Sequence, residues 1–216
     1  MPKVVDHDAR RQILAATAAN VIAQRGLENT TLKDVAAEAG FTPGLVGHYF
    51  DSKDQLMRAA LSHVDQRSAE RFALLRNRSL RRALEAILPL DHSRREEWWV
   101  RISFWGRTMV QPKLKNELAQ SMVYAQDTLE YIINEQKEQG HLRPDLDATV
   151  AAEAMLNLLM GMSLRILFDP KLYTRKKVMQ TLDDYVNDLA REPSADEDKS
   201  SADEDNSSAE PGSAPL

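Results

Sequence analysis

TLKDVAAEAGFTPGLVGHYF, residues 31–50, is the stretch that decides how this chain folds. Apolar residues recur in its first half at the spacing of one helical face, which predicts a short helix packed inward: Leu32, Val35, Ala36 and Ala39. Thr31 and Asp34 have the spacing of a capping box at the start of that helix. Gly40 stands where a left-handed residue ends a helix.

A second short helix follows after a tight turn. Thr42 can cap it, and Pro43 fits its first position, where no N–H group is needed. Its inward residues are then Val46, Tyr49 and Phe50, and its outward residues are Pro43, Gly44, Gly47 and His48. This geometry lays a recognition helix in the major groove of DNA, so we interpret residues 31–50 as a helix-turn-helix.

Gly44 and Gly47 are unusual in this second helix, because each costs about 1 kcal/mol relative to alanine. One interpretation is close approach of the helix backbone to DNA, which leaves base contact to Pro43, Leu45 and His48 and phosphate contact to their neighbours. The other is a close crossing of helices within the protein. We favour DNA because donors suited to phosphate surround the motif, and Ser52 and Gln55 form a second capping box. The predicted DNA-binding residues are Thr31, Lys33, Thr42, Pro43, Gly44, Leu45, Gly47, His48, Tyr49 and Lys53.

The run from Gly26 to Leu56 resembles the N-terminal domain of TetR-family transcriptional regulators. The matching residues are Gly26, Thr30, Thr31, Val35, Ala36, Ala39, Gly40, Thr42, Gly44, His48, Tyr49, Phe50, Lys53 and Leu56. The resemblance implies that the recognition helix begins at Thr42. It also implies that four residues touch phosphates: Thr31, Thr42, Tyr49 and Lys53. Gly47 departs from the bulkier residue of many relatives. The preceding helix of the family would have its inward stripe at Ile13, Leu14, Thr17, Ala18, Val21 and Ile22.

Composition points to a soluble regulator in the cytoplasm. The 216 residues include no cysteine, and the N-terminus has no apolar signal segment. We expect no stretch of the uncharged length that a transmembrane helix needs. The five histidines lack metal-ligand spacing, and no phosphate loop or nucleophile motif is present. The sequence therefore predicts no cofactor, no metal, no membrane association and no enzymatic activity.

The net charge of -5 belongs to the C-terminal tail. Residues 192–216 repeat SADED and carry eight acids and one base, which is -7, so residues 1–191 carry about +2. The tail has almost no large apolar residues, and we expect it to be disordered. Such a tail could compete weakly with DNA phosphate for the basic face, or it could bind a partner. We favour the third interpretation, that it is only a solvated extension.

The rest of the chain reads as helices over 53–76, 79–88, 94–110, 113–139, 147–168 and 174–190, separated by proline and glycine. The sequence thus predicts an all-α protein. We divide it into a DNA-binding domain (1–54), a helical bundle for ligand binding and dimerisation (55–191) and the acidic tail (192–216).

All three tryptophans lie within eight residues of one helix, 94–110. The predicted ligand-binding stripe is Trp98, Ile102, Trp105 and Met109. Such a stripe is either ordinary core or the wall of a pocket for an apolar or cationic effector. Phe104, Trp105, Met109, Gln111, Pro112 and Leu114 resemble the subset of choline-responsive BetI repressors. That resemblance implies a choline-like effector, which Arg101 and Arg107 would discourage if they face the pocket.

The helix 147–168 is apolar over most of its circumference and needs cover on more than one side. The TetR resemblance implies a four-helix dimer interface here; a buried helix in a monomer core is the alternative. The predicted interface is Ala151, Met155, Leu158, Leu159, Met162, Leu182, Tyr185 and Leu189. A dimer is favoured because two recognition helices read a palindromic operator.

We therefore expect a homodimeric, ligand-responsive repressor that binds double-stranded operator DNA. Two alternatives belong to other classes. One is a helical small-molecule-binding protein or enzyme whose N-terminal domain is only structural, and the other is an architectural DNA protein that binds without regard to sequence.

Overall fold

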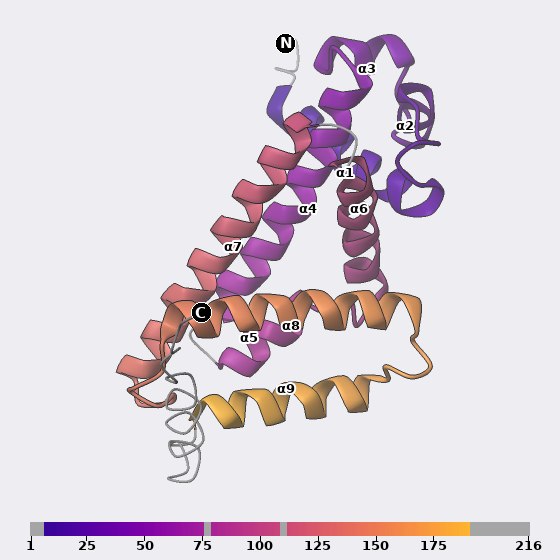
Figure 1. Cartoon of the computed structure of the whole chain (residues 1–216). Coiled ribbons are helices and arrows are strands. Elements are labelled where there is room, and N and C mark those ends of the chain that lie inside the picture. Colours follow the sequence, from indigo (N-terminus) through magenta and orange to yellow (C-terminus); the bar gives the residue numbers. More distant parts are fainter. Residues whose placement is uncertain (1–6, 76–78, 109–111, 191–216) are drawn as a thin grey trace, which may run out of the picture.

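The structure, a computed structural model, describes residues 7–75, 79–108 and 112–190. Within these ranges all regular structure is helical, which confirms the all-α prediction. Helices α1 (His7–Arg25), α2 (Leu32–Glu38) and α3 (Pro43–Tyr49) gather at one end (Figure 1). The long α4 (Lys53–Leu75) runs from this end toward α5 (Leu80–Ile87).

The remaining helices complete the bundle. They are α6 (His92–Thr108), α7 (Pro112–Glu138), α8 (Ala148–Phe168) and α9 (Arg175–Ala190). Figure 1 shows α8 and α9 lying across the end of the molecule opposite α3. The helices from α4 onward begin and end within a residue or two of the predicted positions, which is the usual scatter of helix ends.

Local hydrogen bonds fix the helix-turn-helix as predicted. Thr31 and Asp34 form the capping box at the start of α2, each side chain accepting a backbone N–H of the other. Gly40 has a φ of 69°, and the N–H of Phe41 donates to the carbonyl of Ala36 over 2.8 Å, so the chain turns sharply where glycine is required. Thr42 then caps α3 by accepting the N–H of Leu45 over 3.2 Å.

Two buried clusters form the core. The N-terminal cluster joins α1, α2 and α3, and it extends beyond residue 54 to Val64 of α4 and to Val100 and Phe104 of α6. One predicted inward residue is wrong: Ile13 is 50% exposed, because the buried face of α1 runs through Leu14, Ala18 and Val21 instead.

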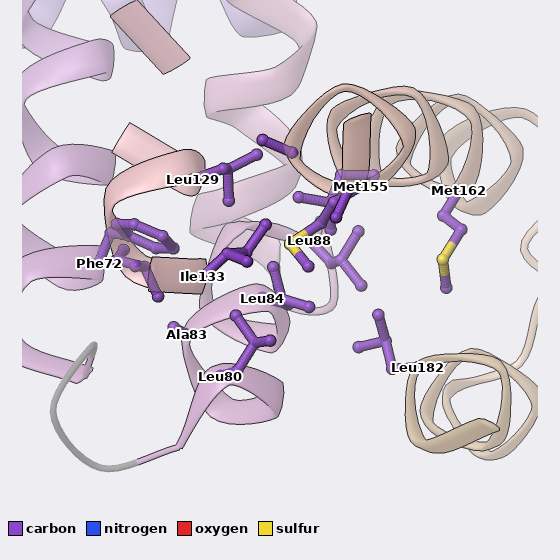
Figure 2. Packing of buried hydrophobic residues seen from close by; sticks show 14 of the residues in the cluster. Phe72, Leu80, Ala83, Leu84, Leu88, Leu129, Ile133, Met155, Met162 and Leu182 are labelled. Atoms are coloured by element: carbon purple, nitrogen blue, oxygen red, sulfur yellow. The ribbon is translucent and has the colours of Figure 1, made fainter. Parts of the chain in front are cut away.

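The second cluster lies between α5, α7, α8 and α9, with Phe72 of α4 at its edge (Figure 2). Leu84 of α5 and Ile133 of α7 meet Met155 of α8 near its centre, and Leu182 brings α9 against the cluster. Burial of these apolar side chains stabilises the bundle, because each Å² of apolar surface removed from water contributes about 25 cal/mol of free energy.

The position of α8 corrects two predictions. By length and composition α8 could cross a membrane, contrary to expectation, and it is the single such helix in the described part of the chain. Its apolar residues instead pack into the second cluster. Five residues predicted to lie in a dimer interface are buried there too and so have no surface for a second chain: Ala151, Met155, Leu159, Met162 and Leu182. Leu158, Tyr185 and Leu189 are partly buried.

Candidate DNA-binding face and effector cavity

The outer face of α3 is exposed, with the orientation that the sequence predicts. Val46, Tyr49 and Phe50 are buried in the N-terminal cluster. Pro43, Gly44, Gly47 and His48 are exposed, and Leu45 is half-buried. This arrangement leaves a short helix whose backbone and small side chains can approach a surface closely.

The two glycines of α3 are not needed by the packing of the protein. A Cβ atom built at Gly44 or Gly47 would meet no heavy atom within 4 Å among the described residues, and neither glycine has a positive φ. The structure therefore gives no close helix crossing at these positions, which removes the alternative explanation for them. Close approach of an external molecule remains as a physical reason for the absent side chains.

The predicted phosphate donors differ in how freely they can reach an anion. Lys33 and Thr42 are exposed, and Thr31 is exposed beside its cap. The Lys53 ammonium donates to the carbonyl of Glu28 over 3.0 Å, which holds it beside the motif. Tyr49 is only 6% exposed, so little of its side chain is available to a phosphate.

Two residues of α1 that the sequence analysis did not assign to the site lie against α3. The His7 ring centroid is 4.5 Å from that of Tyr49 and 6.1 Å from that of His48. Arg11 donates to the carbonyl of Tyr49 over 2.6 Å and lies over the Phe50 ring at 4.4 Å. The sequence signal for them was the basic start of this helix, where His7, Arg10 and Arg11 lie within five residues.

A cavity of about 640 Å³ lies between α4, α6, α7 and α8. Its lining is mostly apolar, and six aromatic residues contribute to it: Phe72, Trp98, Phe104, Trp105, Tyr124 and Tyr131. Tyr124 and Tyr131 are 67% and 52% exposed and mark its mouth. The volume falls within the range of about 300–1,000 Å³ that is typical of sites for drug-sized ligands.

The cavity contains two of the four residues predicted to bind a ligand. Trp98 and Trp105 line it, with their rings 5.9 Å apart and nearly perpendicular. Ile102 does not line it, and Met109 lies outside the described residues. The lining face of α6 steps from Trp98 to Arg101, so it lies on the other side of the tryptophan line from Ile102.

Asp65 and Arg101 form the polar end of the cavity. The Arg101 Nε donates to Asp65 Oδ1 over 3.0 Å, and its Nη2 donates to the Ser68 hydroxyl over 2.7 Å and to the Val64 carbonyl. Arg101 therefore faces the pocket, but with its charge paired. Arg107, in contrast, pairs with Asp54 and Glu28 and does not line the cavity.

α6 joins the cavity to the N-terminal core. Phe104 lines the cavity, is 4% exposed, and belongs to the same buried cluster as Val46 of the recognition helix. A molecule that fills the cavity therefore touches a side chain on which the helix-turn-helix domain is packed.

Comparison with known families bears on both regions. The profile of bacterial regulatory proteins of the tetR family matches residues 13–60, and that of the BetI-type transcriptional repressor C-terminal domain matches residues 76–191. The chain belongs to the TetR family. It is a DNA-binding transcriptional regulator. Its helix-turn-helix lies within residues 13–60, and most of the cavity lining lies in α4 or within residues 76–191.

Individual TetR-family relatives resemble the chain over nearly its whole length. The regulator PksA of Bacillus subtilis (strain 168) is 24% identical over 207 residues, which cover 92% of this chain and 98% of PksA. The regulator BetI of Paraburkholderia xenovorans (strain LB400) is 27% identical over 198 residues, covering 87% and 96%. A transcriptional regulator from Saccharomonospora viridis, crystallised in complex with choline, has a TM-score of 0.73 at 25% identity, covering 83% and 96%.

Proposed function

We propose that the chain is a homodimeric repressor that binds a palindromic operator and leaves it when a small molecule fills the cavity between α4, α6, α7 and α8. The observation that carries the proposal is the double role of Phe104, which lines the cavity and packs in the N-terminal core. Because this core holds α3 in place, a ligand that moves α6 also shifts the position of the recognition helix. Such a regulator acts in the cytoplasm, where its operator lies.

The dimer in this proposal uses the outward face of α8. Val150 and Phe168 are 63% and 65% exposed, and Ala154 and Gly161 lie between them on the same side of the helix. Two-fold pairing of this face with that of a second chain would bury apolar surface and present two copies of α3 to two half-sites. Leu158, half-buried on α8, would lie within this interface.

The predicted DNA-binding residues keep the roles that the sequence suggests. Pro43, Leu45 and His48 would contact bases, with the backbone at Gly44 and Gly47 close to the DNA. Thr31, Lys33, Thr42 and Lys53 would contact phosphates, whereas Tyr49 would contribute little more than its hydroxyl because it is buried.

A linkage experiment tests the proposal. A thermal-shift screen of metabolites identifies a compound that stabilises the protein, by about 2.7 kcal/mol at 100 times its Kd. That compound should weaken operator binding, and operator DNA should weaken binding of the compound by the same factor. A stabilising compound with no effect on DNA affinity would contradict release by ligand. Absence of sequence-specific, salt-dependent DNA binding would favour a small-molecule-binding protein instead.

A further inference from the structure

The cavity holds a carboxylate that faces an aromatic, apolar space. Asp65 lines the cavity, and its side chain is 41% exposed. Its Oδ1 accepts from Arg101, and its Oδ2 has no hydrogen-bond partner among the residues that the structure describes. Burial raises the pKa of Asp65, and Arg101 opposes that rise only in part. The carboxylate would therefore gain from a second positive charge.

Arg101 is much less available to a ligand than Asp65. Its side chain is 13% exposed, and it already donates to three acceptors, one each from Asp65, Val64 and Ser68. Its guanidinium lies 5.5 Å from the centroid of the Trp98 ring. This end of the cavity thus already holds one cation between a carboxylate and an aromatic ring, the arrangement that suits a positive charge.

Arg58 is the third charged residue of the lining, and it lies at the exposed mouth. It precedes Asp65 by two turns of α4, about 10 Å along the helix axis. Charges at an exposed mouth are screened by salt at about this distance, so Arg58 affects a cation held at Asp65 only weakly.

The size of the cavity sets the size of the ligand. A cation as small as choline would leave most of the 640 Å³ to water and much of the aromatic lining without contact. Apolar contact with the lining contributes about 25 cal/mol per Å² removed from water, so a larger ligand gains more. Asp65 is the one carboxylate among the described lining residues, whereas the hydroxyl groups of Ser62, Ser121 and Thr128 are spread along α4 and α7.

We propose that the effector of this cavity is a bulky hydrophobic cation, larger than choline, whose charge lies at Asp65 and whose apolar body packs between Trp105, Phe104 and α7. This assignment rests on the proposed ligand-responsive function, but it concerns binding alone. An anionic ligand drawn to Arg58 or Arg101 is the competing outcome.

Tetraphenylphosphonium and tetraphenylborate test the sign of the charge, because they share size and shape and carry opposite charges. Binding of each to the full chain is measured by calorimetry and by tryptophan fluorescence, to which Trp98 and Trp105 of the lining contribute. The phosphonium should bind at least about tenfold more tightly than the borate, because Asp65 attracts its charge and repels that of the borate. It should also bind at least about tenfold more tightly than choline, because its phenyl groups contact more of the apolar lining. Equal or tighter binding of the borate, or of choline, would overturn the assignment.

Asp65→Asn tests the residue. It should weaken phosphonium binding about tenfold and leave borate binding unchanged or stronger, while Asp65→Glu, which keeps the charge, should retain the preference for the cation. Asp127→Asn on α7, an exposed carboxylate outside the lining, is the matched control. Phosphonium affinity unchanged in a folded Asp65→Asn protein would contradict the assignment. Should Asp65→Asn fail to fold, the wild-type preference between the two probes and the Asp65→Glu protein decide.

The two levels of the proposal fail separately. If the protein binds a specific operator but shows no preference for the phosphonium, the repressor function stands and the proposed ligand class is rejected. If the protein binds the phosphonium through Asp65 but binds no specific DNA, the proposed ligand class stands and the repressor function is rejected.

Discussion

The helix-turn-helix and the C-terminal bundle differ in where their structure is encoded. Each helix end of the former depends on residues within a few positions of it, such as Thr31 with Asp34, or Thr42 with Leu45. The bundle depends on side chains far apart in sequence, such as Phe72, Ile133 and Leu182 in one cluster. Local hydrogen bonds set the ends of the short recognition helix, whereas packing between helices distant in sequence surrounds the cavity.

The largest expected effect separates the two sides of α8. Met162→Glu places a charge in the second cluster, where Met162 is 5% exposed, and should cost at least about 3 kcal/mol, because the charge has no partner there. Urea unfolding followed by circular dichroism measures the loss. A Met162→Glu protein as stable as the wild type would mean that α8 is not packed as described.

The other side of α8 should respond through assembly rather than folding. Val150→Glu combined with Phe168→Glu should give folded monomers, because both residues are mostly exposed. Operator affinity should then fall about 100-fold as bivalent binding is lost. Sedimentation and DNA titration measure the two effects, with Asn134→Glu on the exposed face of α7 as control. Intact dimers of the double variant would place the interface elsewhere.

A smaller effect is expected at the start of α4. Lys53→Ala should lower the slope of log affinity against log salt concentration by about one unit and weaken binding to all DNA sequences alike, because one phosphate contact is lost. Lys176→Ala on α9, an exposed lysine far from the helix-turn-helix, should change neither quantity. Equal slopes for Lys53→Ala and the wild type would remove Lys53 from the site.

The smallest expected effect raises the stability of the fold and lowers the affinity for the operator. Gly44→Ala and Gly47→Ala should each stabilise the protein by about 0.5–1 kcal/mol, since a Cβ has room at both positions and alanine favours a helix. Both should weaken operator binding. Gly106→Ala in α6, which also has room for a Cβ, should stabilise the fold similarly without affecting DNA affinity. Stabilised α3 variants that bind the operator normally would show that DNA does not approach these glycines closely.

The comparison also explains which predictions from the sequence succeeded. Helix ends and the exposed face of α3 followed from caps, turns and periodicity, which act over a few residues. The side of α8 that faces its own core could not be derived, because a helix that is apolar nearly all round gives no direction. Met155 and Met162 were therefore assigned to an interface although they are buried within the chain.

The cavity was only half predictable for the same reason. The cluster of tryptophans indicated Trp98 and Trp105, but both faces adjoining their line, one with Arg101 and one with Ile102, were consistent with the sequence. The packing of α6 against α1 and α4 decided between them. Asp65 and Tyr124 come from α4 and α7, and no periodicity within either helix relates them to the tryptophans.

Selection of DNA duplexes from a random pool by the full-length protein tests the central claim most directly. The account predicts enrichment of an inverted repeat whose half-sites are spaced for two copies of α3, bound at least about 1,000-fold more tightly than scrambled DNA of the same length. Enrichment of no sequence, or binding to scrambled duplexes with equal affinity, would contradict the assignment of this chain as a dimeric operator-binding regulator.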